Sequence, residues 1–153
     1  MDMLNNEMPM LIFKNKLVTY WGNADHKMSF TTIADTTNYT TNVTLDASSP
    51  RYLRIAGDLI SPREIREVMN ELSGQKFELL RTGGLCLLSL LIKIVKKLTP
   101  STTELYPVWQ GMQYMRNMAD ERATLTAIDN DCYPIMKWTT VKHLLSIHSV
   151  SKQ

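Results

Sequence analysis

A strand, a turn and a capped helix are predicted, in that order, by RYLRIAGDLISPREIREVMNELSG, residues 51–74 of the chain. Residues 51–56 alternate between two faces, as in a short strand with one buried side. Ser61, Pro62 and Glu64 then have the spacing of a helix N-cap, a first helical residue and the acidic partner of a capping box. We therefore expect a strand–turn–helix unit of a larger α/β protein, with no chemistry of its own.

The helix in this unit has one apolar face and a clear end. Ile60 before the cap and Ile65 after it are placed to form a hydrophobic staple. The apolar positions follow at i, i+3, i+4 and i+7, the spacing of an amphipathic helix: Ile65, Val68, Met69 and Leu72. Gly74 is expected to end the helix in the left-handed conformation that glycine adopts without strain.

The composition limits the class of protein. With 44% hydrophobic and 21% charged residues over 153 positions, the chain is an ordinary globular domain and not a disordered one. A net charge of +2 with scattered basic residues does not indicate a nucleic-acid partner. Cys86 and Cys132 are too few for a disulfide framework or a zinc site, which favours a reducing, cytoplasmic location. Residues 9–13 enter core-like sequence abruptly, so the chain is expected to be the later part of something longer.

The amino-terminal part alternates short strands and turns. Residues 11–13 and 17–21 suit a hairpin or two small strands, and residues 28–31 suit another strand. Thr32 is a helix N-cap candidate with Asp35 as its box partner. Five threonines follow before Leu45, and they favour a strand; the cap favours a helix, and a helix is our prediction.

After the first unit, residues 76–80 are predicted to form a strand and residues 82–84 a turn. Residues 85–98 are the most apolar part of the chain, but Lys93, Lys96 and Lys97 make the segment too short and too charged to span a bilayer. The lysines share one face near the carboxyl end, where they suit the helix dipole. Two interpretations remain open: a core helix with one solvated edge, or a partner-binding helix with an exposed apolar face.

A further helix is expected to start between residues 104 and 107, to end near Met118, and to have an apolar side that begins with Leu105. Aromatic and methionine side chains on it suit an adaptable apolar pocket, although plain core packing explains them as well: Trp109, Met112, Tyr114 and Met115. Residues 129–133 are predicted to be a polar loop. Thr139 is predicted to cap a last helix whose inner face carries Val141, Leu144, Leu145 and His148.

The sequence shows no active site on its own residues. The six glycines nowhere have the spacing of a dinucleotide-binding loop, and Thr82-Gly83-Gly84 alone is not a phosphate-binding motif. The three histidines share no metal-ligand spacing, so no metal is expected. Asp25-His26-Lys27 has an acid–base composition that a solvated loop explains better. Cys86 is expected to be buried and inert, and Asp35 to be a helix cap and not a catalytic carboxylate.

The order of these pieces resembles a known family. YWGNADHKMSFTTIAD, residues 20–35, is similar to the segment that follows the Rossmann core in atypical short-chain dehydrogenases. Residues 51–74, with ISPRE and the closing Ser73-Gly74, resemble the next segment of the same proteins. The resemblance is to the NmrA-like family, which includes isoflavone-reductase-like and NAD(P)H-dependent reductase members. It covers nearly the whole chain, up to the Trp138-Thr139-Thr140 ending.

The resemblance implies the carboxyl-terminal part of a Rossmann-like NAD(P)-binding fold with a small, mostly helical substrate-side subdomain. Residues 1–60 would be the last elements of the α/β core and residues 61–153 the subdomain. The family's dinucleotide loop and catalytic lysine have no counterpart here, so neither catalytic nor cofactor-binding residues transfer. Trp109, Met112 and Tyr114 would form a pocket wall beside the nicotinamide.

The resemblance also implies a function for the complete protein. That protein would bind NADP or NAD and transfer a hydride to a small apolar carbonyl, enone or quinone. This chain alone is expected to hold no cofactor and to be inactive. A non-catalytic dinucleotide sensor or a protein-interaction module is the alternative. The partners expected are the small-molecule substrate and, as one option, a second copy in a homodimer, but neither nucleic acid nor a membrane.

Overall fold

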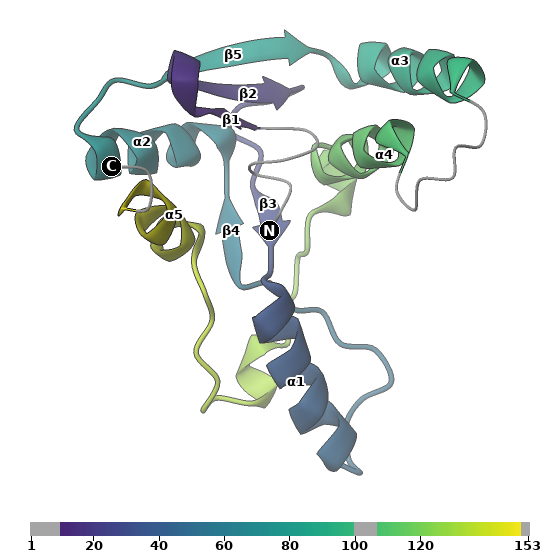
Figure 1. Ribbon diagram of the computed structural model, residues 1–153. Helices are drawn as coiled ribbons and strands as arrows, with labels where there is room; N and C mark the ends of the chain where they lie inside the picture. The colour runs from purple at the N-terminus through teal and green to yellow at the C-terminus, as the bar shows by residue number, and fades with distance from the viewer. Residues whose placement is uncertain (1–9, 100–106, 151–153) are drawn as a thin grey trace.

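The computed structural model describes residues 10–99 and 107–150 and shows a mixed α/β fold (Figure 1). The strands are β1 (Leu11–Ile12), β2 (Leu17–Trp21), β3 (Met28–Phe30), β4 (Asp58–Ile60) and β5 (Glu78–Gly83). The helices are α1 (Ile33–Leu45), α2 (Pro62–Ser73), α3 (Leu85–Leu98), α4 (Val108–Met118) and α5 (Val141–Val150), with 3-10 turns η2 (Phe13–Asn15), η3 (Glu121–Ala123) and η4 (Asn130–Cys132). The α/β class is confirmed. None of the helices in the described ranges has both the length and the apolar character needed to cross a membrane.

β2 is the centre of a three-stranded sheet in the order β1-β2-β5. β1 pairs with it in an antiparallel manner, as the predicted hairpin requires, and β5 pairs with it in parallel, with Thr19 opposite Leu80. Parallel strands need a long crossover connection, and the residues between β2 and β5 provide it. α2 belongs to that crossover and contacts both strands, so it covers one face of the parallel pair (Figure 1).

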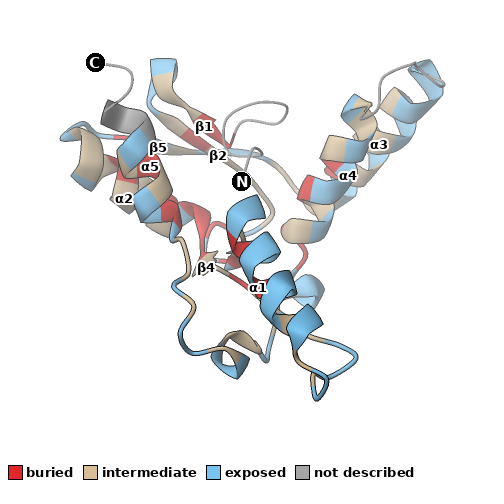
Figure 2. Ribbon diagram, turned by 60° about the horizontal axis from the view of Figure 1, so that its bottom comes forward, coloured by how far each residue is buried: buried red, intermediate tan, exposed pale blue. Residues whose placement is uncertain are grey.

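β3 and β4 form a second, two-stranded antiparallel sheet that leads from the first sheet toward α1 (Figure 1). Met28 lies opposite Ile60, and both are buried together with Phe30. The predicted strand at residues 28–31 is therefore confirmed as β3. The pair places α1 at the far end of the molecule, where most of its surface is exposed (Figure 2).

α2 has the ends that its sequence predicts. The Ser61 side chain accepts a hydrogen bond from the Glu64 amide at 3.2 Å, and Glu64 Oε2 accepts one from the Ser61 amide at 2.8 Å. Gly74 has φ 63°, and its amide donates to the Asn70 carbonyl at 3.0 Å. Both the capping box and the left-handed glycine are confirmed, because each depends only on residues within four positions of the helix end.

The strand predicted at residues 51–56 is wrong. The backbone there pairs with a loop from far along the chain: the Arg54 amide donates to Asp129 Oδ2 at 2.7 Å, and the Asp129 amide donates to the Arg54 carbonyl at 2.7 Å. The Asn130 side chain bonds to both backbone groups of Ala56: Oδ1 accepts from the Ala56 amide at 3.2 Å, and Nδ2 donates to the Ala56 carbonyl at 2.7 Å. The backbone of Asp129 and the side chains of Asp129 and Asn130 thus take the hydrogen bonds that a neighbouring strand would have taken, and the strand forms at β4 instead.

α1 confirms the helix that was predicted in spite of its threonines. Thr32 Oγ1 accepts from the Asp35 amide at 2.9 Å, as the cap requires. The carboxylate of Asp35 does not complete the box and binds elsewhere in the chain. The helical threonines Thr36, Thr37, Thr40, Thr41 and Thr44 each donate to the carbonyl four residues earlier. Each hydroxyl therefore finds a partner on the surface of its own helix.

The remaining elements differ from the predictions mainly at their ends. α3 has the predicted bounds, whereas the strand predicted at residues 76–80 begins and ends later, as β5, and includes two of the three residues predicted to form a turn. α4 begins at Val108, and Leu105 lies outside the described residues. The last helix is capped by Thr140 instead of Thr139, because Thr140 Oγ1 accepts from the His143 amide at 3.2 Å.

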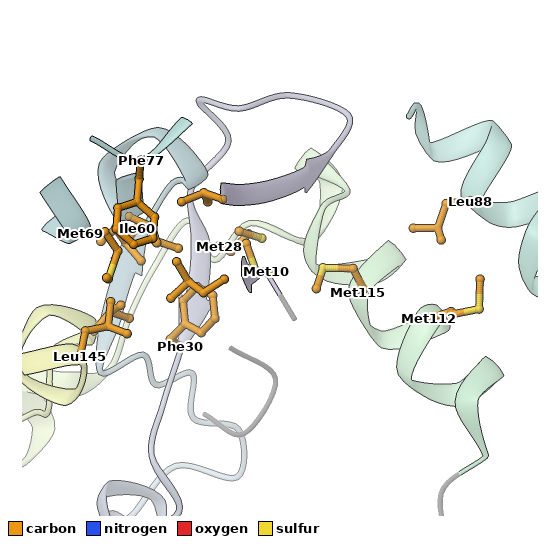
Figure 3. Close-up of a cluster of buried hydrophobic side chains, with 14 residues drawn as sticks. Met10, Met28, Phe30, Ile60, Met69, Phe77, Leu88, Met112, Met115 and Leu145 are labelled. Carbon is orange, nitrogen blue, oxygen red and sulfur yellow. The ribbon is translucent and has the colours of Figure 1, made fainter. Parts of the chain in front are cut away.

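The hydrophobic core runs from α2 and α5, across both sheets, to the contact between α3 and α4 (Figure 3). Ile65 and Met69 of α2 are fully buried, and Val141 and Leu145 of α5 are buried beside that helix, while the side chain of His148 is outside the described set. At the other end Leu88 of α3 lies beside α4 (Figure 3). One hydrophobic core thus extends from the parallel strands to α3 and α4, the helix that carries the predicted pocket residues.

Candidate functional site

The three predicted pocket residues lie on α4, but they do not share one surface. Trp109 faces α3, since the Lys96 ammonium lies 4.7 Å from the centre of its ring. Met112 is buried in the core close to Leu88 (Figure 3). Tyr114 is 56% exposed, because two residues along a helix turn the side chain by about 200° from Met112. Trp109 and Met112 are therefore brought together, and Tyr114 is separated from them.

α3 has an exposed apolar side. Leu88 is the one residue of this helix that is buried, and four large apolar residues are 45–75% exposed: Leu87, Leu90, Ile94 and Leu98. We call these four residues the α3 seam. Cys86, which was predicted to be buried, is exposed, because α3 packs against α4 through the opposite side. The exposure favours the partner-binding interpretation over a core helix with one solvated edge.

His26 connects the turn after β2 to the end of α4. The ring is buried, and Nε2 donates a hydrogen bond to the Met118 carbonyl at 2.9 Å. Asn23 Nδ2 donates to Glu121 Oε1 at 3.0 Å in the same region. The prediction of a solvated loop is therefore wrong for His26. A period of two could have revealed this: residues 24, 26, 28 and 30 are all buried, so His26 lies on the inner face that continues into β3.

Two arginines converge on Asp120, just after α4. Its carboxylate accepts from Arg116 Nη1 at 3.0 Å and from Arg122 Nη2 at 2.7 Å and Nε at 2.9 Å. These hydrogen bonds, those from Arg122 above all, hold the pKa of the Asp120 carboxyl well below its usual value. Arg116 Nε also donates to Ser89 Oγ at 3.3 Å. The cluster ties α3 to α4 and was not found in the sequence.

Asp120 predicts a pH dependence of stability. The pKa of Asp120 is lower in the folded state than in the unfolded state. The stability that this carboxylate contributes is therefore present above the unfolded pKa of about 3.9 and is lost as the pH falls toward the folded pKa. We expect Asp120→Asn to lower the melting temperature at pH 7. We also expect the melting temperature of this variant to decrease less between pH 6 and pH 3 than that of the unmodified chain. Thermal unfolding at several pH values measures this. The exposed Asp131→Asn serves as the control, and parallel curves for Asp120→Asn and the unmodified chain would contradict the prediction.

A hollow lies between α1 and residues 132–137. It is an open groove of about 660 Å³, lined by Asn38, Thr41, Asn42, Cys132, Tyr133, Pro134, Ile135, Met136 and Lys137. The Tyr133 hydroxyl donates to Asp46 Oδ2 at 3.0 Å, and its ring meets Tyr39 edge to face at 5.2 Å. Burial raises the pKa of Tyr39 to about 12, and its hydroxyl donates to the Asp129 carbonyl at 2.8 Å. Both phenol hydroxyls therefore have structural roles, because each donates to a residue on another segment of the chain.

Asp35 is a buried carboxylate with a structural role. Oδ2 accepts from the Thr139 amide at 3.0 Å, and Oδ1 accepts from the Thr139 hydroxyl at 3.1 Å. Asp58 acts in the same way, since its Oδ2 accepts from the Val141 amide at 2.8 Å. The two carboxylates fix the segment that enters α5. Asp35 therefore takes part in the cap of α1 only through its backbone amide, which donates to Thr32, and its side chain binds the distant Thr139.

Gly83 allows close packing inside the protein. A β-carbon at this position would lie 2.8 Å from Trp21 Cζ3 and 2.9 Å from Leu87 Cδ2. The neighbouring Gly84, which precedes α3, has no such neighbour within 4 Å. The space left by Gly83 is thus taken by Trp21 and Leu87, which agrees with the absence of a phosphate-binding pattern in the sequence.

Replacement of Gly83 by alanine should be destabilising. The added methyl group has to displace the Trp21 ring, and overpacking of this kind costs about 1–3 kcal/mol. Gly84→Ala is the matched control, with an expected loss below about 1 kcal/mol because its β-carbon points into open space. Chemical denaturation of both variants measures the difference. Equal losses would contradict the packing role of Gly83.

Within residues 10–99 and 107–150 no three histidine, cysteine or acidic side chains are grouped as metal ligands. No protein-family model matches the chain, and no curated protein matches it either. The family resemblance therefore stays a prediction from the sequence. The positions that the structure distinguishes are the Trp109–Met112 side of α4, the α3 seam and the groove beside α1.

Proposed function

We propose that this chain is the carboxyl-terminal, substrate-side portion of an NmrA-like NAD(P)-dependent oxidoreductase with a Rossmann-like fold. The reaction would be hydride transfer to a small apolar carbonyl, enone or quinone. The observation that carries the proposal is the parallel pairing of β2 with β5 across a connection that contains α2. The connection also contains β3, α1 and β4. Parallel strands whose connecting helix covers the sheet are what α/β nucleotide-binding folds are built from.

The cofactor would be NADP or NAD, and the residues that hold it would lie outside this chain. The sequence contains no glycine-rich dinucleotide loop, and Gly83 is occupied with internal packing. The contribution of this chain would be to shape the substrate pocket. Trp109 is the best placed of the predicted residues, because it is half-buried and lies between α3 and α4.

NADPH titration and turnover test the proposal. The 153-residue chain alone should show no saturable NADPH binding. The polypeptide that includes the sequence encoded ahead of Met1 should bind NADPH and oxidise it with small enones or quinones. In that longer protein Trp109→Ala should raise the KM for the enone and leave NADPH affinity unchanged. Tight NADPH binding by the 153-residue chain, or an upstream sequence unrelated to a strand and a glycine-rich turn, would refute the proposal.

A non-catalytic dinucleotide sensor or interaction module of the same family is the second candidate. The exposed α3 seam favours it, since a seam of this kind suits a protein partner. The same titration separates the two candidates. NADPH binding by the longer protein without turnover of any enone or quinone would select the sensor, and NADPH oxidation would select the reductase.

A further inference from the structure

The α3 seam has the geometry of a helix-binding surface. Leu87, Leu90, Ile94 and Leu98 follow one another at intervals of three, four and four residues, so they form one narrow row along α3. Leu98 is 75% exposed and the other three are 45–53% exposed. Figure 2 shows α3 at the edge of the molecule, beside α4. A narrow row of this length is the surface that a second helix packs against.

The charge beside the seam indicates the charge that a partner should carry. Lys93 and Lys97 are exposed, lie one turn apart, and follow the same edge of the seam. None of the ion pairs in the described part of the chain involves either of them. Neither α3 nor α4 contains an acidic residue. The lysines are therefore available to a partner that carries carboxylates at its own edge.

Two other occupants fit the seam less well. In an antiparallel two-fold pairing of α3 with a second copy, the lysine edges of the two helices would face each other. In a parallel pairing each lysine edge would meet the other edge of α3, and because α3 has no acidic residue the lysines would stay uncompensated in both cases. A membrane surface favours helices with a broad apolar face. The seam is a single row, bounded by Lys93 and Lys97 on one side and by the α4 contact on the other.

We propose that the α3 seam docks an acidic amphipathic helix of another polypeptide. Apolar residues of that helix would cover the seam, and its glutamates or aspartates would pair with Lys93 and Lys97. This interaction goes beyond the proposed oxidoreductase function and does not depend on a cofactor.

Cys86 provides a sensitive test. It is exposed, and its spacing of seven and eleven residues from Lys93 and Lys97 places it on the lysine edge of α3. In a Cys132→Ser background, Cys86 is equilibrated with 14-residue helical peptides that carry leucines at the seam spacing and a terminal cysteine capped with glutathione. The Cys86 thiolate displaces glutathione and forms the peptide disulfide, so the equilibrium yield reports the non-covalent contact.

A peptide with glutamates beside its leucines should give about tenfold more disulfide than the same peptide with lysines, because two ion pairs replace two repulsions. Lys93→Glu with Lys97→Glu should invert that order. Leu90→Ser with Ile94→Ser should reduce both yields to that of a scrambled peptide. Because about half of each side chain is exposed, the protein should stay folded, which circular dichroism checks.

Three results would overturn the proposal. Equal yields for the glutamate and lysine peptides would remove the role of the lysines. Preferential formation of a Cys86–Cys86 dimer would assign the seam to a second copy of the chain. Sedimentation with phosphatidylserine-containing vesicles, without selective capture of the glutamate peptide, would assign it to a membrane surface.

Discussion

Ile65→Ala should lower the free energy of unfolding by about 2–5 kcal/mol, the range measured when a large aliphatic side chain is removed from a packed core. Ile65 is fully buried, and its helix contacts β2, β5 and α5. The deleted atoms therefore leave a cavity at the point where the parallel pair meets the last helix. A loss of this size is a large fraction of the stability of a typical domain, which is about 5–15 kcal/mol.

Urea denaturation followed by circular dichroism measures this loss as a shift of the midpoint at constant slope. Glu67→Ala on the same helix is the matched control: this side chain is exposed, and its replacement should change stability by no more than about 0.5 kcal/mol. A loss below about 1 kcal/mol for Ile65→Ala would show that α2 does not pack against the sheet as described.

Asp35→Ala is expected to have the second large effect, a loss of about 3 kcal/mol. The carboxylate is buried and accepts two hydrogen bonds from Thr139, and hydrogen bonds to a charged group are worth about 1.5–3 kcal/mol each. Alanine would leave the Thr139 amide without its acceptor. It would also release the segment that leads into α5 from α1.

A double-mutant cycle separates the two hydrogen bonds. Thr139→Val removes the hydroxyl and keeps the amide, so it should cost less than Asp35→Ala and should reduce the cost of Asp35→Ala when the two are combined. Exposed Asp131→Ala is the control for the loss of a carboxylate. An unchanged cost of Asp35→Ala in the Thr139→Val background would show that the hydroxyl contributes nothing.

The sequence predicts the local features well. The capping box of α2 and Gly74 depend on residues a few positions apart, and the cap at Thr32 was sufficient to predict α1 against the strand preference of its threonines. In each case the interacting groups are neighbours in sequence, so their spacing alone determines whether they can meet. The parallel pairing of β2 and β5 depends on distant residues and could be expected only through a family resemblance.

Apart from shifts at the ends of elements, the errors involve partners that are far apart in the chain. Residues 51–56 alternate like a strand, but Asp129 and Asn130 take their backbone hydrogen bonds. His26 has the composition of a solvated loop until the Met118 carbonyl is known to lie beside it. Cys86 lies in the most apolar segment of the chain, and only the packing of α3 on α4 shows that it faces outward. No spacing rule within one segment gives such contacts.

The hydrogen bonds between residues 129–141 and residues 35–58 also determine when folding can finish. They join α1, the segment after it and β4 to partners 74 to 104 residues later. While the protein is being synthesised, α2 can complete both of its caps as soon as Gly74 has left the ribosome. Asp35 must wait until Thr139 has emerged, and Asp58 until Val141 has emerged. A premature stop codon ahead of residue 129 would therefore release a nascent chain with its capped helix formed and its amino-terminal third unsecured.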